Sequence, residues 1–489
     1  MAIIDKKGSF CYKAAVRPEF IVFLIAYLVA LLAVGLKFSR RMTSLDDFFL
    51  ASRSLSSGLV FLSLTASWFG ATSILVTTDQ ALQAGVSAFW LVGVPAVATV
   101  ILLGLFLAGP IRRLDVQTLP SLIAARYGRL VGHASSILLL WYMITLASSQ
   151  MVALGQFLRP FLGLPYVWGL GLGTAVVLVY LLSGGLRSVV ATDVLQCLLL
   201  VLGLTWLAVH LARASPLSEV ARQAAAGGAL GFFVDGRRNI LIALSFVLAW
   251  MISPIAWQRI QAAGSVKKAR AGLFAAAGAF IVLYSLVVFV GVFSRPLFAG
   301  RSLEHPLVAG LILSQAGTVA GGLLFVSVIA AILSTLDTAL NTGAMTLTRD
   351  ILGGRSGRLG AGPGSPVRTG RLATVIVAVL AFGIAARMQS ILQTLGMASE
   401  IMAEGLFVPG MAIFVLKKRT PAAGALGLLL GGGFALLSFL SALRIVPFVL
   451  PAWPSSVPYG VALSALGFAL GYLIDSLRPA LKVPRGFVI

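Results

Sequence analysis

The chain has 489 residues, of which 59% are hydrophobic and only 11% are charged, and its mean hydropathy is +1.01. A soluble core of this length needs many more charged residues to cover its surface, so the composition excludes a soluble globular protein. The formal net charge of +22 indicates loops that face anionic lipid, because no Arg and Lys stripe with interleaved aromatic residues points to a nucleic-acid partner.

Apolar runs long enough to cross the ~30 Å hydrocarbon layer recur along the whole chain. They predict an all-α polytopic membrane protein with about thirteen transmembrane helices. The first run is followed by KFSRR and lacks a small-residue cleavage site, so we expect a retained span rather than a signal peptide. The expected spans lie near 19–38, 57–84, 88–110, 132–158, 165–183, 186–211, 237–262, 270–294, 311–349, 371–390, 394–418, 421–441 and 456–475.

Two of these spans, 57–84 and 311–349, are too long to cross as single straight helices, so each must tilt, break or extend into water. The first contains LTASWFGATS (64–73), where small and hydroxyl residues surround Gly70. Such residues weaken a helix and let chains approach closely. The stretch therefore indicates either a break, which would free the carbonyls from Ala66 to Phe69 for a cation, or a packing face between two helices.

An odd number of spans places the termini on opposite sides of the membrane. The Lys and Arg residues favour an outer N-terminus and a cytoplasmic C-terminus, because the segments that would then lie inside hold most of them. We expect a multi-pass protein of the cell (inner) membrane. Segment 44–58 is expected to be an interfacial connector, and the Gly/Ser/Arg-rich stretch 353–371 a cytoplasmic linker.

The ninth span carries AAILSTLDTALN (330–341), in which Ala331, Ser334, Thr335 and Asp337 occupy adjoining parts of one helical surface. Sodium is a hard cation that prefers oxygen ligands, which two hydroxyls and a few carbonyls supply. An acid in mid-span costs roughly 2.5–3.5 kcal/mol on insertion scales, so a cation, a proton or a facing donor must compensate it. The pattern favours an ion site, although Ser and Thr also bond back to their own helix.

Four stretches carry a recognisable pattern: SGGLRSVVATDVLQ (183–196), WQRIQAAGSVKKAR (257–270), AAILSTLDTALN (330–341) and GLFVPGMAIFVLKKRTPAAGALG (405–427). They resemble the sodium:solute symporter family, whose members carry sugars, proline, pantothenate, monocarboxylates, iodide and sialic acid. The connector LDDFFLASRSLSSG is a fifth, weaker match. The resemblance implies a leucine-transporter-like fold with a five-plus-five inverted-repeat core. Its expected parts are 1–56 (tail, first span and connector), 57–211 and 237–418 (the two repeats), and 419–489 (two C-terminal spans and a cytoplasmic tail).

The resemblance also implies a sodium site between the first and eighth core helices. Two backbone carbonyls of the first helix would fall on Ala66 and Phe69. A carbonyl and two hydroxyls of the eighth would fall on Ala331, Ser334 and Thr335. The cofactor expected from this match is Na+.

Asp193 and Asp337 are the acids that this site leaves unassigned. The resemblance implies that Asp193 lines the path of sodium into the cell or belongs to a second ion site, whereas a structural pairing with Arg187 or another inner base is the alternative. Asp337 could complete such a second site with Ser334, Thr338 and Asp193.

The resemblance further implies that the solute binds at the midplane, beside the broken first helix of each repeat. Thr145 stands where a sialic-acid carrier would have an arginine, and no Asn/Gln/Lys cluster suits a hexose. Glu400 and Glu404 share one helical face and could meet an amine, be protonated, or face the outer vestibule. The substrate-binding candidates are Trp68, Ser73, Tyr142, Thr145, Trp250, Ser253 and Glu404.

The sequence therefore predicts sodium-coupled symport of a small organic solute by alternating access. Proton coupling within the same fold and a symporter-like membrane sensor remain alternatives. A membrane enzyme is disfavoured, since no HExxH, Asp-rich or Ser-His-Asp pattern appears in the sequence. The expected partners are a small-molecule solute and the lipid bilayer, with no nucleic acid and no obligatory protein partner.

Overall fold

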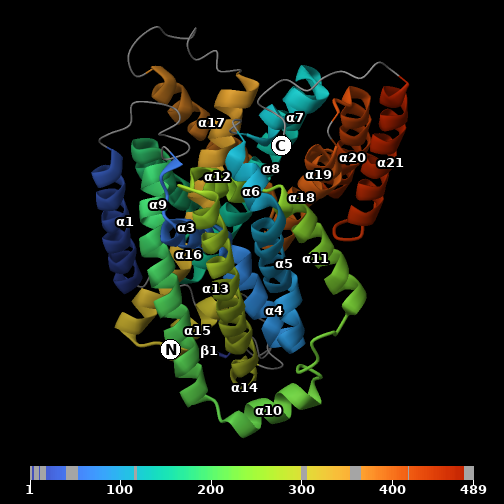
Figure 1. Ribbon diagram of the computed structural model, residues 1–489. Helices are drawn as coiled ribbons and strands as arrows, with labels where there is room; N and C mark the ends of the chain where they lie inside the picture. Colours follow the sequence, from blue (N-terminus) through green and yellow to red (C-terminus); the bar gives the residue numbers. More distant parts are fainter. Residues whose placement is uncertain are drawn as a thin grey trace.

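The computed structural model describes residues 3–4, 10–11, 18–39, 53–114, 118–298, 305–352, 365–416 and 418–477. Helices make up nearly all of this part of the chain, as predicted, and they pack side by side into one bundle (Figure 1). A short antiparallel pair, β1 (Ile3–Ile4) and β2 (Phe10–Cys11), precedes them. Most of the expected connector 44–58 and of the linker 353–371 lies outside the described residues.

The helices of the first half are α1 (Pro18–Ser39), α3 (Ser57–Trp68), η2 (Thr72–Val76), α4 (Thr77–Ala84), η3 (Gly85–Ala88), α5 (Phe89–Leu102), η4 (Leu103–Leu107), α6 (Ala108–Arg113), α7 (Leu119–Tyr127), α8 (Arg129–Leu162), α9 (Tyr166–Ala214) and α10 (Leu217–Ala226). Those of the second half are α11 (Gly236–Met251), α12 (Pro254–Ala262), α13 (Val266–Phe293), α14 (Arg295–Phe298), α15 (Leu307–Gln315), α16 (Thr318–Met345), η5 (Thr346–Ile351), α17 (Ser365–Arg387), α18 (Ile391–Glu400), η7 (Ile401–Leu406), α19 (Phe407–Val415), α20 (Pro421–Ala442) and α21 (Val457–Ser476).

Within the described residues, ten helical segments are long and apolar enough to cross a membrane, and the bent pair α11–α12 makes an eleventh. The expected count of thirteen is thus not confirmed. Two shorter apolar helices, Ser57–Trp68 and Tyr166–Leu182, also occur. The first is short because the predicted second span is interrupted.

That interruption lies at Phe69 and Gly70. Helix α3 ends at Trp68, Phe69 leaves the helical region with φ −90° and ψ 65°, and the π-helical η2 follows. The other over-long span is also divided, because Ala316 and Gly317 separate α15 from α16. The span expected at 311–349 therefore begins at Thr318 rather than at 311.

Helices α11 and α12 form a third broken element, with a bend of 42° between them. Pro254 begins α12, where its missing N–H is tolerated at the first turn and its ring would obstruct a continuous helix. The span expected at 237–262 is thus two helices joined at Ile252 and Ser253.

Helix α9 covers the two spans expected at 165–183 and 186–211. A methyl group added to Gly35 would lie 3.4 Å from Tyr180 Cβ and 3.0 Å from Ser188 Oγ. Residues eight apart in a straight helix are about 12 Å apart. The chain therefore bends sharply between Tyr180 and Ser188, as two successive spans require.

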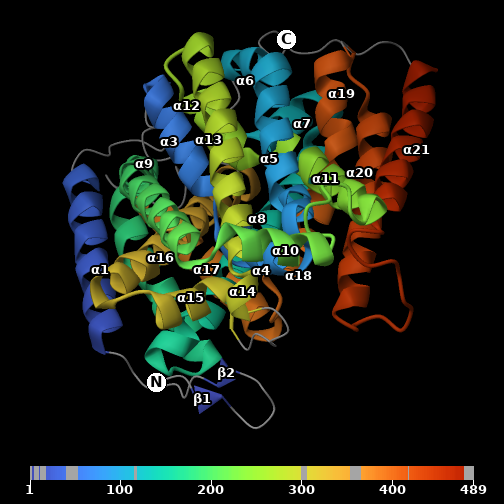
Figure 2. The same ribbon diagram turned by 90° about the horizontal axis from the view of Figure 1, so that it is seen from below.

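The centre of the bundle is α16. It packs against α3, α8, α9 and α17, and nearly all its side chains from Gly321 onward are buried. Viewed at right angles, the helices surround it while α1 and α21 stay at opposite edges (Figure 2). The polar sequence STLDT therefore faces other helices rather than lipid.

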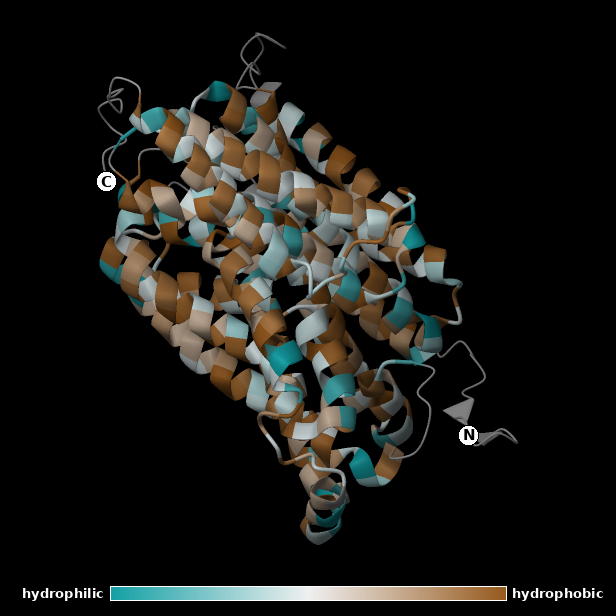
Figure 3. Cartoon of the chain, turned by 90° about the vertical axis from the view of Figure 1, so that its right-hand side faces the viewer, coloured by the Kyte–Doolittle hydropathy of each residue, from teal (hydrophilic) through white to brown (hydrophobic). Residues whose placement is uncertain are grey.

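The outer helices carry the apolar surface. On α1, Val22, Ile25 and Val29 are more than half exposed, and Leu466 and Leu473 on α21 are as well. Brown, hydrophobic residues dominate the outer helices in Figure 3. An exposed apolar belt on a helical bundle is typical of lipid contact.

Candidate ion and solute site

The break in the second span brings α3 into hydrogen-bond contact with α16. The Ser334 hydroxyl donates to the carbonyl of Ala66 at 2.8 Å and to that of Ala331 at 2.9 Å. The Thr335 hydroxyl lies 3.4 Å from the same Ala331 carbonyl. Four of the five oxygens predicted for sodium thus lie in one buried group, and the fifth residue, Phe69, sits at the break beside it.

One hydroxyl carries one hydrogen, so Ser334 cannot satisfy both carbonyls at once. The group therefore holds more oxygen lone pairs than it has hydrogens to share. Ser334 is fully buried, and Ala66 and Ala331 are each 1% exposed. Such an arrangement suits a small cation, which accepts several oxygens at the same time.

Gly70 permits the close approach of the two helices. A methyl group at this position would lie 2.8 Å from Gln150 Oε1 and 3.0 Å from Thr335 Cβ, and nearer still to Thr335 Oγ1. The Gln150 side chain also accepts a hydrogen bond from the backbone N–H of Ala71 at 3.0 Å. Gln150 on α8 thereby satisfies a backbone group that the break leaves without a helical partner.

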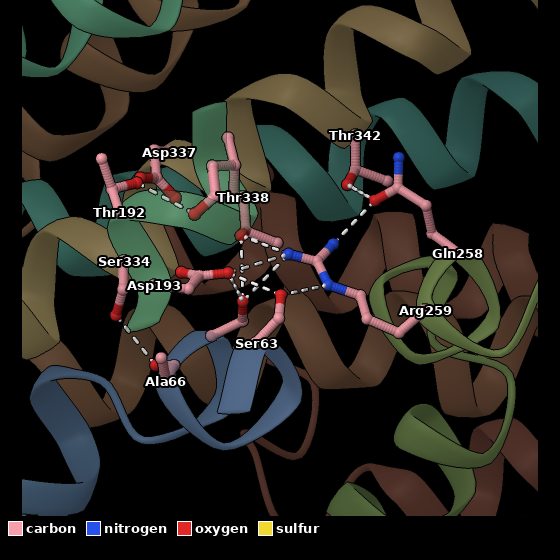
Figure 4. Close-up of polar contacts among 12 residues, drawn as sticks. Ser63, Ala66, Thr192, Asp193, Gln258, Arg259, Ser334, Asp337, Thr338 and Thr342 are labelled. Atoms are coloured by element: carbon pink, nitrogen blue, oxygen red, sulfur yellow. Dashed lines mark hydrogen bonds and ion pairs between the residues drawn. The ribbon is translucent and has the colours of Figure 1, made fainter. Parts of the chain in front are cut away.

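A second polar group, the arginine cluster, consists of Ser63, Ser67, Asp193, Arg259 and Thr338. Figure 4 shows Arg259 of α12 entering between α3, α9 and α16. Its guanidinium lies 3.5 Å from Asp193 Oδ2 and donates to Ser63, Ser67 and Thr338 at 3.2, 3.0 and 2.9 Å. Ser63 in turn donates to Asp193 at 2.6 Å.

Asp193 is therefore paired with a base, as the structural alternative expected, but the base is Arg259. The side chain of Arg187 lies outside the described residues. Asp193 Oδ1 accepts no hydrogen bond from the described part of the chain, so the pairing leaves half of this carboxylate open. Ion passage and structural pairing thus both remain compatible with its position.

Asp337 of α16 is fully buried and is not among the residues that line the solute cavity described below. The Tyr180 hydroxyl donates to its Oδ2 at 2.6 Å, whereas its Oδ1 has no hydrogen-bond partner among the described residues. Two buried acids thus share the neighbourhood of one arginine, and each keeps an oxygen available.

A small cavity lies beside the break. It is lined by aromatic, apolar and uncharged polar residues: Ser67, Trp68, Gly70, Thr72, Ser73, Val92, Tyr142, Leu146, Gln150, Trp250, Ile255, Thr335 and Leu395. The space open to the centre of a water molecule is about 40 Å³, enough for about three waters. The Trp68 and Trp250 rings contact each other in its wall, with centroids 5.3 Å apart, so a larger solute requires part of this wall to move.

Four of the seven substrate candidates, Trp68, Ser73, Tyr142 and Trp250, line this cavity. The other three do not. The Thr145 hydroxyl bonds back to the Trp141 carbonyl at 3.0 Å, Ser253 lies at the bend between α11 and α12, and Glu404 packs against Gly460 of α21.

Sequence reasoning did not assign Arg259, Tyr180 or Tyr284. The Tyr284 hydroxyl lies 2.7 Å from that of Ser73, so it positions a cavity residue. The WQR sequence did carry a signal for Arg259, since an arginine inside an apolar span needs an acidic partner. Its partner lies 66 positions away in the chain and becomes evident only in the fold.

Comparison with known families identifies this arrangement. The model of the sodium:solute symporter family matches residues 48–432, most of the chain. The chain belongs to the sodium:solute symporter family. The resemblance found in the sequence is thereby confirmed, and the protein is a membrane transporter rather than an enzyme. The family implies sodium as the coupling ion and small molecules as solutes.

Individual relatives match over most of their length. The chain is 27% identical to a sodium/glucose cotransporter of Vibrio parahaemolyticus, covering 88% of this chain and 86% of that protein. It is 24% identical to an osmoregulated proline transporter of Bacillus subtilis, covering 86% of this chain and 89% of that protein. A solved Na+-coupled sialic acid symporter shares the fold, with a TM-score of 0.79 and 18% identity over 95% of this symporter and 99% of the other.

Proposed function

We propose that this symporter couples the entry of sodium to the entry of a small, uncharged or zwitterionic organic solute by alternating access. The observation that carries the proposal is the convergence of the Ala66 and Ala331 carbonyls on the Ser334 hydroxyl. Sodium would be bound by these oxygens, by Thr335 and by the carbonyl of Phe69. The expected repeats 57–211 and 237–418, the flanking parts 1–56 and 419–489, and the outer N-terminus and cytoplasmic C-terminus in the cell membrane, form part of the same proposal.

The position of these oxygens supports coupling between ion and solute. Thr335 belongs both to the ion group and to the wall of the solute cavity, and Gly70 of the same wall lies directly against it. Sodium would pull the broken segment of α3 toward α16 and so fix the cavity wall formed by Ser67, Trp68 and Gly70. Each ligand then raises the affinity for the other by the same factor.

The walls of the cavity support the class of solute. None of the described residues that line it carries a charged side chain, so a solute with net charge would have no charged partner in a buried site. Trp68 and Trp250 offer flat apolar surfaces. Ser73, Tyr142, Gln150 and Thr72 offer hydrogen bonds.

Asp193, Asp337 and Thr338 support a second ion site or an ion exit path next to the first. The uncompensated oxygens of the two acids face a region with one described cation, Arg259. Either a second sodium or a proton would supply the missing positive charge. A sodium gradient and a proton gradient, applied separately, distinguish these two couplings.

The experiment is solute uptake into proteoliposomes, with solutes first selected by thermal shift of the purified protein in sodium and in choline. An inward sodium gradient is expected to drive accumulation, and the double variant Ser334→Ala with Thr335→Ala is expected to abolish the sodium dependence. The matched control is Ser327→Ala with Thr348→Ala. Its hydroxyls bond to the carbonyls of Leu199, Leu323 and Ala344, away from the proposed site.

Uptake that ignores the sodium gradient contradicts the proposal. Sodium dependence that survives in the double variant contradicts the assigned ligands while leaving the symport itself intact.

A further inference from the structure

Two glutamates, Glu400 and Glu404, lie deep in the protein and outside the ion and solute site. Glu400 ends α18 and Glu404 lies in the π-helical turn η7; they are 2% and 0% exposed. Neither lines the solute cavity. Both face the C-terminal pair α20–α21, which packs against η7.

The Glu404 side chain occupies a space made for it by glycines. A methyl group at Gly460 of α21 would overlap the Glu404 carboxyl, and one at Gly431 of α20 would overlap the Glu404 backbone carbonyl. Neither carboxyl oxygen of Glu404 has a hydrogen-bond partner among the described residues. The Glu400 carboxyl, by contrast, accepts a short hydrogen bond from the Ser456 hydroxyl.

The surrounding elements provide no positive charge in contact with the pair. Helices α19 and α20 contain no titratable residue. On the other packed elements the titratable groups lie elsewhere. On α21, Tyr459 and Tyr472 are 58% and 39% exposed, and Asp475 accepts from the backbone N–H of Ala423. On α8, Tyr142 lines the cavity, His133 bonds to Arg129 near the start of the helix and Arg159 is in its last turn, while Arg237 and Arg238 begin α11. No ion pair found in the described residues reaches Glu400 or Glu404.

An ionised Glu404 would thus hold a negative charge in a buried site, without a hydrogen-bond donor among the described residues and beside a second acid. Burial of an unpaired carboxylate is strongly unfavourable, and a neighbouring acid adds to the cost. The neutral acid avoids both penalties. We propose that Glu400 and Glu404 form a proton-binding site, with the proton on Glu404, between the transport core and α20–α21.

The chemistry is a simple association, in which a proton from the aqueous phase adds to one carboxylate oxygen and is released to the same phase.

The proton-binding site is connected to the wall of the solute cavity. The segment preceding α21 reaches the core through Ser456 and through Trp453, which packs on Gly396 and donates to Ser245 Oγ at 2.9 Å. Loss of the proton would weaken this docking beside Leu395, which lines the cavity.

The experiment exploits the small number of glutamates, since the chain has only five. Full-length protein labelled with carboxyl-¹³C glutamate is examined by infrared spectroscopy without sodium or solute, so a failed transport hypothesis does not affect the result. A protonated glutamate band is expected near neutral pH. It should weaken by the contribution of one carboxyl in Glu404→Gln and disappear from wild type at high pH.

Glu219→Gln is the control. Glu219 pairs with Arg222 at 2.6 Å on the surface helix α10, and that hydrogen bond lowers the pKa of Glu219, so its removal should leave the band unchanged. If Glu404→Gln does not fold, the pH titration of wild type and of Glu400→Gln, which keeps Glu404, replaces it. The proposal is overturned if wild type shows no such band, or if Glu404→Gln retains it in full.

Discussion

Replacing Gly70 by alanine tests whether the broken helix must touch α16 for sodium to bind. The added methyl group would lie 2.8 Å from Gln150 Oε1 and 3.0 Å from Thr335 Cβ, in contact with Thr335 Oγ1. Overpacking of this kind typically costs about 1–3 kcal/mol. If the sodium-bound state bears this cost, sodium affinity should fall about 5- to 150-fold, since 1.4 kcal/mol corresponds to a factor of ten.

The assay is sodium titration of purified protein, followed by tryptophan fluorescence because Trp68 lies next to the break. Gly278→Ala is the matched control, since a methyl group there meets no atom within 4 Å. It should leave the sodium affinity unchanged. Equal sodium affinity in Gly70→Ala and wild type would refute the reasoning, because it would mean that Gly70 and Thr335 can separate without loss of the ion site.

Three further predictions concern the surroundings of this site. Arg259→Met should destabilise the protein by roughly 3–5 kcal/mol, because it leaves the buried Asp193 carboxylate uncompensated. Adding Asp193→Asn to this variant should recover much of the lost melting temperature. An unchanged melting temperature in Arg259→Met alone would count against the pairing. Gln150→Leu should cost about 1–3 kcal/mol in thermal unfolding, because the N–H of Ala71 loses its acceptor; a neutral effect would show that this N–H has another partner. Trp250→Ala should weaken solute binding in thermal-shift titrations while leaving sodium binding within about twofold. Trp250 lines the cavity but is not one of the proposed sodium ligands. Equal losses of solute and sodium binding would argue against separate sites.

Local helical geometry explains which features of the site were predictable. Ala331, Ser334 and Thr335 lie at spacings of three and four, so one helix alone places their oxygens together. The small residues around Gly70 indicated either a break or a packing face, and α3 ends in that same stretch. The family resemblance joined these two segments, and the structure brings them within hydrogen-bond distance.

Features that depend on how distant helices meet were not predictable. Asp193 and Arg259 belong to different helices, and nothing in either local pattern specifies that one faces the other. Glu404 was expected near the solute because its helix contributes to the cavity. Its side chain instead points to Gly460, since the rotation of η7 is determined by its packing on α20 and α21. The count of thirteen spans is not confirmed for a related reason, because breaks divide apolar runs into shorter helices.

The most direct test of the sodium site is a cryo-electron microscopy comparison of the protein in sodium and in choline. The account predicts density in sodium alone, surrounded by the Ala66, Phe69 and Ala331 carbonyls and the Ser334 and Thr335 hydroxyls, with the Ser334 hydrogen turned away from Ala66. A map in which Ser334 still bonds Ala66 in saturating sodium, with the ion elsewhere, would contradict it.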